Sequence, residues 1–450
     1  MLRPHFRRPG RSDTDATTIG LLLVLLLLLL AGGGGGFVLW ERQRAQQAEL
    51  AAMAKEELAR EEAERDRAEA EEARAAAERR RPKEPPRVQD ILRGGPPHPA
   101  TPCLEEGLKA CAAGQVNVGL LWFARGLEQS GNDANQQQLF RANLAAWGRP
   151  QPPPRELFRQ KGAVTALAVS PDGKTILAGG EDGSARAWPI DGGKAVGEVP
   201  PAGDKVGAVG FGAGGKEWLV ANGGEVRRVD PATGKLADES SDTPGNVVAM
   251  GPAANGKMMM CGTCEQGVWL SEGGQRQGAT KLFNAESPML SAALGPDVRI
   301  ILTGHEDHMA RLWGADRKPL GSPLRHEGPV RAVAVSADGT WLATAAGKAV
   351  RLWDTATRQP VGPSRVHEAD VASLAFSPDG KTLLTGDAAG AVRLVTVPAP
   401  LVEDVQRLEL WAETLARSAL DVGGHVHQLD EATVLQLRQK LQELGGPPKP

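Results

Sequence analysis

The sequence predicts a mainly β fold, a β-propeller of six blades with seven as the alternative, and three observations predict it. First, six segments align with one another at a constant period. Second, each segment alternates apolar and polar residues around tight turns, which is typical of antiparallel hairpins. Third, a period of about 41 residues suits a blade of four short strands. The aligned turn positions are Gly173, Gly215, Gly256, Val298, Gly339 and Gly380.

Residues at fixed places in these segments resemble WD repeats, and the resemblance covers residues 155–398. It implies a buried polar network in each blade between a His, a turn Asp and a Trp. No single repeat carries all three, so we expect an incomplete network, and only Trp353-Asp354 completes the signature dipeptide. The matching positions are Asp182, Trp188, Asp307, Trp313, His326, Trp353, Asp354 and His367.

The resemblance also predicts how the ring closes, because the outer strand of such a blade usually belongs to the next repeat. The sixth repeat ends at Val397 without an outer strand, whereas residues 155–160 are strand-like and precede the first repeat. If they complete the last blade, the ring leaves no raw sheet edge. The proline run Pro152 to Pro154 leaves no room for a seventh repeat before it.

A membrane anchor is expected near the N-terminus. Residues 1–15 form a basic tail, and residues 16–40 contain no charged side chain, which is enough chain to span a bilayer. A cleaved signal peptide is the alternative, but the apolar stretch continues to Trp40, past any cleavage site. The charge bias favours a single-pass membrane protein with a cytoplasmic N-terminus and the propeller outside the cytoplasm.

Between the anchor and the repeats lie a charged stalk, a linker and a small helical module. Residues 41–81 hold 12 acidic residues, 10 basic residues and 13 alanines, a composition that favours one long helix or coiled coil. Self-association through its alanine-rich side stays open. Residues 82–102 are a linker rich in Pro and Gly. Residues 103–147 predict a helical hairpin, and its small residues resemble the spacing of a single tetratricopeptide repeat.

After the repeats, residues 402–445 predict a C-terminal tail of two amphipathic helices flanking a hairpin at Gly423-Gly424. His425 and His427 share one face of this hairpin, without an evident third metal ligand. The module at 103–147 is expected to act as a cap on the propeller, with a peptide-binding groove as the alternative. These helical parts are therefore expected to accompany the propeller rather than to carry chemistry.

The charged and sulfur-containing residues nominate no catalytic, cofactor or metal site. With 52 basic and 55 acidic residues, the net charge of −3 argues against a nucleic-acid binder. Cys261 and Cys264 form a C-x-x-C pair, interpreted as structural or incidental, with a disulfide as the alternative. The turn that contains His305, Asp307 and His308 is the remaining place for a metal, although a polar blade turn with Asp307 in its usual place is the preferred interpretation.

The whole arrangement resembles large bacterial WD-repeat proteins, in which a membrane helix, and sometimes a Ser/Thr kinase, precedes the repeats. Kinase motifs are missing from these 450 residues. We therefore expect a non-catalytic, membrane-anchored scaffold that binds proteins or peptides. One alternative is a sensor module working with a separate kinase, and another is a propeller enzyme with a metal at the His305–His308 turn. The sequence leaves the binding face unknown.

Overall fold

The computed structural model describes residues 98–449, except for 213–214, 216, 232, 234–240, 244, 253–257, 265–266, 273–279 and 284–286. The predicted basic tail, membrane span and charged stalk, with most of the linker, lie outside the described residues. Within the described part, no helix has both the length and the apolar character needed to cross a membrane. The described residues belong to one compact unit, which spans Pro85–Pro450.

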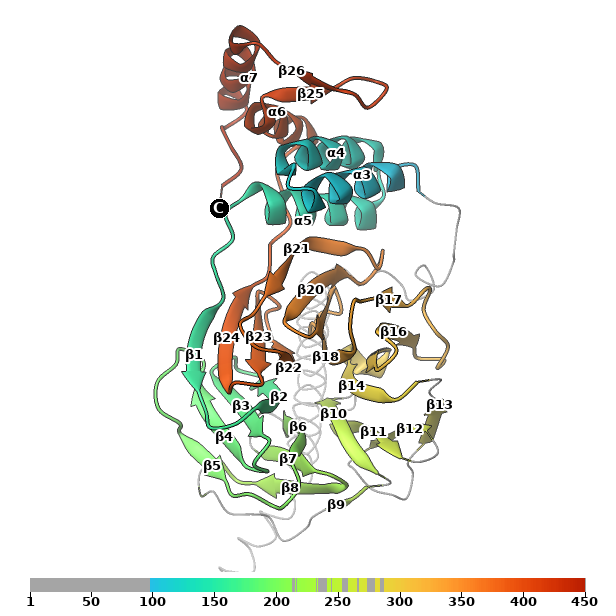
Figure 1. The fold of residues 1–450 in the computed structure, drawn as a ribbon, viewed down its shortest axis with the longest axis vertical. Helices are drawn as coiled ribbons and strands as arrows, with labels where there is room; N and C mark the ends of the chain where they lie inside the picture. The colour runs from blue at the N-terminus through green and yellow to red at the C-terminus, as the bar shows by residue number, and fades with distance from the viewer. Residues whose placement is uncertain are drawn as a thin grey trace, which may run out of the picture. The chain divides into compact units, whose positions relative to one another are not determined.

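Most of the described chain forms four-stranded antiparallel sheets arranged as a β-propeller (Figure 1). Five blades use strands that follow one another in the chain. In order, these blades are β2 (Val164–Val169), β3 (Thr175–Gly180), β4 (Ala185–Pro189) and β5 (Gly197–Val199); β6 (Val206–Phe211), β7 (Trp218–Asn222), β8 (Glu225–Val229) and β9 (Ser241–Asp242); β10 (Asn246–Pro252), β11 (Met258–Cys264), β12 (Gly267–Glu272) and β13 (Thr280–Phe283); β14 (Met289–Leu294), β15 (Ile300–His305), β16 (Met309–Gly314) and β17 (Leu324–Arg325); β18 (Val330–Val335), β19 (Trp341–Ala346), β20 (Ala349–Asp354) and β21 (Pro360–Val366).

A further four-stranded sheet joins the two ends of the array, and we call it the closing sheet. It consists of β22 (Val371–Phe376), β23 (Thr382–Asp387), β24 (Ala391–Thr396) and β1 (Arg155–Arg159). Strand β1 runs antiparallel to β24, with Arg155 opposite Leu394 and Arg159 opposite Ala391. The strand expected at residues 155–160 is therefore the outer strand of this sheet.

The blade count expected from the sequence needs correction. Five blades, rather than six or the alternative seven, are built from consecutive strands of the chain. The closing sheet is not such a blade, because the last repeat supplies only three strands before the chain leaves towards the C-terminal helices. Its fourth strand, β1, comes from the opposite end of the array.

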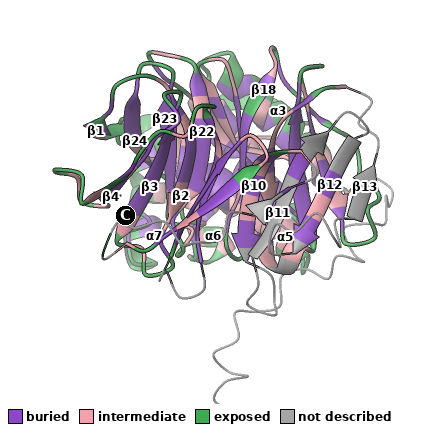
Figure 2. Ribbon diagram, turned by 90° about the horizontal axis from the view of Figure 1, so that it is seen from below, coloured by how far each residue is buried: buried purple, intermediate pink, exposed green. Residues whose placement is uncertain are grey.

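The inner strands surround the centre of the ring and the outer strands lie at its rim (Figure 1). Neighbouring inner strands contact each other all the way round, and β2 contacts β22 to complete the circle. Figure 2 shows buried residues concentrated along the strands and exposed residues along the turns. Side chains such as Ile176, Leu302 and Leu342 are fully buried between sheets. Alternation along each strand thus places its apolar side chains in the core.

Short polar turns connect the first and second strands of the blades. In one of them the Ser170 hydroxyl donates to the Asp172 carboxylate at 2.5 Å and accepts from the Thr175 amide at 2.9 Å. Gly173 has a φ of +72°, a conformation that favours glycine. The same hydrogen bonds recur after Ser336 and Ser377. This turn chemistry explains why the S-P-D-G pattern repeats in the sequence.

The helices form a separate layer beside the propeller. The region expected to be a helical hairpin contains three helices, and the expected C-terminal helix–hairpin–helix follows β24. These elements are α3 (Thr101–Ala112), α4 (Val116–Gln129), α5 (Ala134–Gly148), α6 (Val405–Ala416), β25 (Ser418–Leu420), β26 (Val426–Gln428) and α7 (Glu431–Glu443). Helix α4 packs against α3, α5 and α6, so the two helical regions form one unit.

Small residues pack the helices against one another, and one buried amide docks this helical unit onto the ring. Gly126 packs directly against the ring of Phe140, where any side chain would clash. Asn143 in α5 donates to the Pro360 carbonyl at 3.3 Å and accepts from the Gly362 amide at 3.0 Å. Helix α5 therefore satisfies backbone groups on the outer edge of β21, which would otherwise stay open to pairing with another chain.

Candidate interaction face

One end of the sheets gathers two sets of connections, which we together call the turn face. It comprises the turns between the second and third strands of the sheets and the loops that lead into the inner strands. Backbone hydrogen bonds join the two sets, for example from Glu306 to the Pro288 carbonyl at 3.0 Å and from Ala388 to the Asp370 carbonyl at 2.8 Å. Because these turns are held by their neighbours, the side chains on the turn face have a rigid frame.

The helical unit packs against the other end of the strands. In β21, Pro360 lies opposite Trp353 and Val366 lies opposite Ala349, so Pro360 is at the end away from the turn face. Asn143 contacts this far end, and Gln138 donates to the Asp354 carboxylate at 3.2 Å there. The helices and the turn face therefore occupy opposite ends of this blade.

Arginines recur at one register of the third strand, a pattern that our sequence reasoning missed. All five are paired with residues of the second strand, such as Thr303 with Arg311 and Thr344 with Arg351. One of these arginines lies in the closing sheet. In β12 the aligned position is occupied by Trp269 instead of an arginine. The recurrence near the 41-residue period was the signal that could have revealed them. These residues are Arg186, Arg227, Arg311, Arg351 and Arg393.

Two of these arginines pair with the aspartates at the motif positions. Arg311 lies 2.6 Å from the carboxylate of Asp307, and this hydrogen bond lowers the pKa of Asp307. Arg186 lies 3.5 Å from Asp182 and 2.8 Å from Glu198. Burial tends to raise the pKa of Asp182, but its other contacts, including the Arg186 charge, lower it overall. The sequence-predicted aspartates thus fix the arginines at the turn face.

The other arginines find different partners. Arg227 is buried and donates to the Pro200 carbonyl and the Asn222 side chain, both at 2.8 Å. Arg351 lies 3.8 Å from Glu327, whose side chain is 95 % exposed. The arginine side chains are therefore fixed by contacts with the sheets and loops, whereas some of their glutamate partners extend into solvent.

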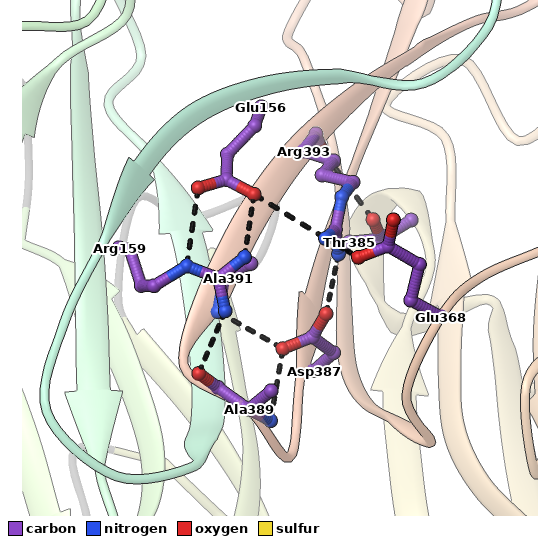
Figure 3. A network of polar contacts seen from close by, with 8 residues as sticks. All are labelled: Glu156, Arg159, Glu368, Thr385, Asp387, Ala389, Ala391 and Arg393. Atoms are coloured by element: carbon purple, nitrogen blue, oxygen red, sulfur yellow. Dashed lines mark hydrogen bonds and ion pairs between the residues drawn. The ribbon is translucent and has the colours of Figure 1, made fainter.

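The most enclosed of these pairs joins the two ends of the repeat array (Figure 3). Arg393 is 9 % exposed and forms an ion pair with Asp387, which is 1 % exposed. The same guanidinium reaches Glu368 at 3.1 Å and Glu156 of β1 at 3.3 Å. Arg159 in turn lies 2.7 Å from Glu156. Charged side chains thus connect β1 with the strands that it completes.

The tryptophans at the motif positions use threonines as partners. The indole N–H groups of Trp313 and Trp353 donate to the hydroxyls of Thr303 and Thr344, each at 2.8 Å. His326 packs edge-on against Trp353, with ring centroids 5.6 Å apart. The indole N–H of Trp353 is thereby satisfied in the absence of a turn aspartate in its own repeat.

The remaining motif residues, Trp188, His367 and Asp354, do not take part in hydrogen bonds between a tryptophan and a threonine. Trp188 stacks on Phe158 at 4.1 Å, and its buried N–H has no hydrogen-bond partner among the described residues. Within that same part of the chain, both ring nitrogens of His367 also lack a partner. Asp354 accepts from Thr357 at the end opposite the turn face, and burial raises its pKa.

We expect Thr344→Val to destabilise the protein by about 1–3 kcal/mol, because it leaves the buried Trp353 N–H unpaired. Trp188→Phe is the matched control, since it removes an indole N–H without a described partner and keeps an aromatic ring beside Phe158. Chemical denaturation measures both variants. Equal losses in the two would contradict a role for the Trp353 hydrogen bond.

Buried histidines make stability depend on pH. Burial lowers the pKa of His326 to about 4, whereas an unfolded histidine titrates near 6.5. The unfolded chain therefore binds the proton first. The contribution of the neutral ring is complete above pH 6.5, and up to about 3 kcal/mol is lost as the pH falls towards 4. We expect His326→Gln to flatten this part of a stability–pH profile. The exposed His308→Gln should leave it unchanged, and an unaltered profile in both variants would refute the assignment.

The residues of the hypothetical metal turn do not converge. His305 is buried and contacts Thr303 at 2.8 Å, whereas Asp307 and His308 are exposed and Asp307 binds Arg311. The described residues contain no group of three or more side chains suited to hold a metal. Cys261 and Cys264 both lie in β11, and their side chains are outside the described part. Cys103 and Cys111 are buried free thiols.

The closed ring of four-stranded sheets defines the class: this is a β-propeller protein. Three segments of the array are WD40 repeats, since a family model described as WD domain, G-beta repeat matches residues 153–189, 317–354 and 359–395. The first match includes β1 with the first strands of the ring. A comparison with curated proteins found no match to this sequence. WD40 propellers are generally non-catalytic scaffolds that bind proteins or peptides.

Proposed function

We propose that this chain is a membrane-anchored, non-catalytic scaffold that binds partner proteins through the turn face of its propeller. The observation that carries the proposal is a ring of WD40 repeats whose turns are rigidly cross-connected at the end away from the helical unit. A rigid frame with side chains on its turns lowers the entropy lost when a partner binds.

The exposed acidic loops are the proposed contact points. Glu327 and Glu368 have side chains that are 95 % and 87 % exposed, and they follow the buried His326 and His367 in equivalent loops. Their arginine partners, Arg351 and Arg393, are held against the sheets. A partner with basic side chains would meet the carboxylates first, and electrostatic attraction would speed the encounter.

Anchoring is supported by the uncharged stretch of residues 16–40, which precedes the charged stalk. In this proposal the N-terminus is cytoplasmic and the propeller lies outside the cytoplasm. A sensor working with a separate Ser/Thr kinase is the second candidate, supported only by the order of membrane helix, stalk and propeller. Protease treatment of sealed vesicles tests the orientation, and resistance to alkaline extraction tests the anchor.

The binding proposal is tested with the full chain in its membrane. Partners are crosslinked, captured and compared between the natural protein and the double variant Glu327→Lys/Glu368→Lys. We expect the variant to lose a reproducible set of partners. Glu443→Lys in α7 is the matched control, because it makes the same change on an exposed helix residue outside the propeller. Identical partner sets for the natural protein and both variants would overturn the proposal.

A further inference from the structure

Helix α7 is held on the helical unit by few buried side chains. The whole helix is within the described part of the chain, and of its 13 residues only Val434 and Leu441 are buried. Leu441 belongs to the same buried cluster as Leu408 of α6, the helix against which α7 packs. Strand β26, which leads into α7, is exposed at every residue. A segment with so few buried contacts opens at a low cost in free energy.

The chain changes direction where α7 ends. The N–H groups of Gly445 and Gly446 donate to carbonyls in the last turn of α7, at 3.0 and 2.7 Å, which is the Schellman arrangement of a helix end. Both glycines have a positive φ, of +98° and +77°. Two prolines follow, and proline cannot continue a helix. Residues 445–449, which we call the strap, therefore leave α7 in a new direction.

Arginines from two other helical segments hold the strap by its backbone. Arg407 of α6 donates to three successive carbonyls of the strap, those of residues 445–447, at 3.1, 2.8 and 3.1 Å. Arg149, the residue after α5, donates to the Lys449 carbonyl. Figure 1 shows the strap running from α7 to the chain that leaves α5. The strap thus fastens the end of α7 to both α6 and α5.

Helix α6 has attachments of its own. Leu408 is fully buried, and α6 packs against α4. Arg141 of α5 donates to the Leu401 carbonyl at 3.0 Å, before α6 begins. Arg125 of α4 donates to the Leu420 carbonyl at 2.9 Å, after α6 ends. The firmly held part of the C-terminal region therefore reaches β25, and the weakly held part begins at β26.

We propose that the strap is a latch for α7. While Arg407 and Arg149 hold the strap, α7 stays on the helical unit. Once they release it, α7 and β26 detach together, and α6 and the propeller remain folded. Detachment removes Leu441 from the buried cluster and exposes its neighbours in that cluster to solvent. The latch therefore controls access to a surface of α6 that is hidden in the closed state. This device goes beyond the proposed scaffold function and does not depend on Glu327 or Glu368.

Hydrogen–deuterium exchange of the detergent-solubilised full chain, followed by mass spectrometry of its peptides, tests the latch. In the natural protein we expect the amides of α7 to exchange about tenfold faster than those of α6, or more. Arg407→Gln should accelerate exchange in α7 by a further factor of about ten, the effect of losing a hydrogen bond from a charged donor. Arg149→Gln should act in the same direction. Exchange in α6 and in the strands of the propeller should stay unchanged in both variants.

Arg438→Gln is the matched control, because Arg438 is an exposed arginine of α7 itself, and arginine and glutamine have similar helix propensities. Its α7 should exchange as in the natural protein. Equal exchange rates for α7 and α6 in the natural protein would overturn the proposal. An unchanged α7 rate in Arg407→Gln, or an equal acceleration of α7, α6 and the propeller strands, would overturn it as well. The partner sets of the Glu327/Glu368 variant are unaffected by any of these results.

Discussion

Replacing Asp387 by alanine should destabilise the protein by about 3–5 kcal/mol, because it leaves the buried Arg393 without its closest counter-charge. The substitution also removes the acceptor of the Ala389 and Ala391 amides, at 3.0 and 2.9 Å. Since Arg393 also contacts Glu156, the loss should be felt at β1, the strand that closes the ring. Denaturant titration gives the stability, and limited proteolysis reports the release of β1.

Asp307→Ala is the control for this prediction, because Asp307 and Arg311 form a similar ion pair at the protein surface. Exposed pairs contribute up to about 1 kcal/mol. A double replacement, Asp387→Leu with Arg393→Met, should recover much of the stability, since it removes both charges together. If Asp387→Ala costs no more than Asp307→Ala, the buried pair does not hold the closing sheet.

Phe140→Ala should destabilise the protein by about 3–5 kcal/mol, the usual cost of the cavity left by a fully buried phenylalanine. Phe140 belongs to a cluster that continues from the helices to Trp341 and Val361 of the propeller. Because this core is shared, we expect a single cooperative transition that shifts to lower temperature. Scanning calorimetry measures both the shift and the number of transitions.

Leu435→Ala provides the control, since Leu435 in α7 is 58 % exposed and its truncation should change stability by less than about 0.5 kcal/mol. A separate low-temperature transition in Phe140→Ala, with the main transition unmoved, would show that the helices and the propeller unfold independently. That result would contradict a common core.

Much of the propeller could be predicted because its signals are local. Alternating strands are written within each 41-residue unit, and the S-P-D-G turn stands in the first and last of them, at Ser170 and Ser377. The closing strand at residues 155–159 was recognisable by its position before the repeats. The blade count depends on how strands from distant parts of the chain combine, which local periodicity does not determine. The same limit explains the third helix between residues 101 and 148, whose packing around Gly126 and Phe140 is a tertiary feature.

The site was less predictable, because hydrogen-bond partners depend on register and side-chain direction. The sequence indicated Trp313 and Trp353, but their acceptors, Thr303 and Thr344, lie on the neighbouring strand. Asp354 completes the sequence signature, yet it points to the helical unit through Gln138. The arginines that hold the strap, Arg149 and Arg407, belong to other helical segments, so the sequence of residues 445–449 does not indicate them.

The pairing of β1 with β24 has a consequence for synthesis on the ribosome. The paired residues Arg155 and Leu394 are about 240 positions apart, so β1 leaves the ribosome long before its partner exists. At roughly 5–20 residues per second, the wait lasts roughly 10–50 s. During this time β1 is a free edge that could pair with another nascent chain. The prolines before it and the charges of Glu156 and Arg159 act as gatekeepers against such pairing until the native partner emerges.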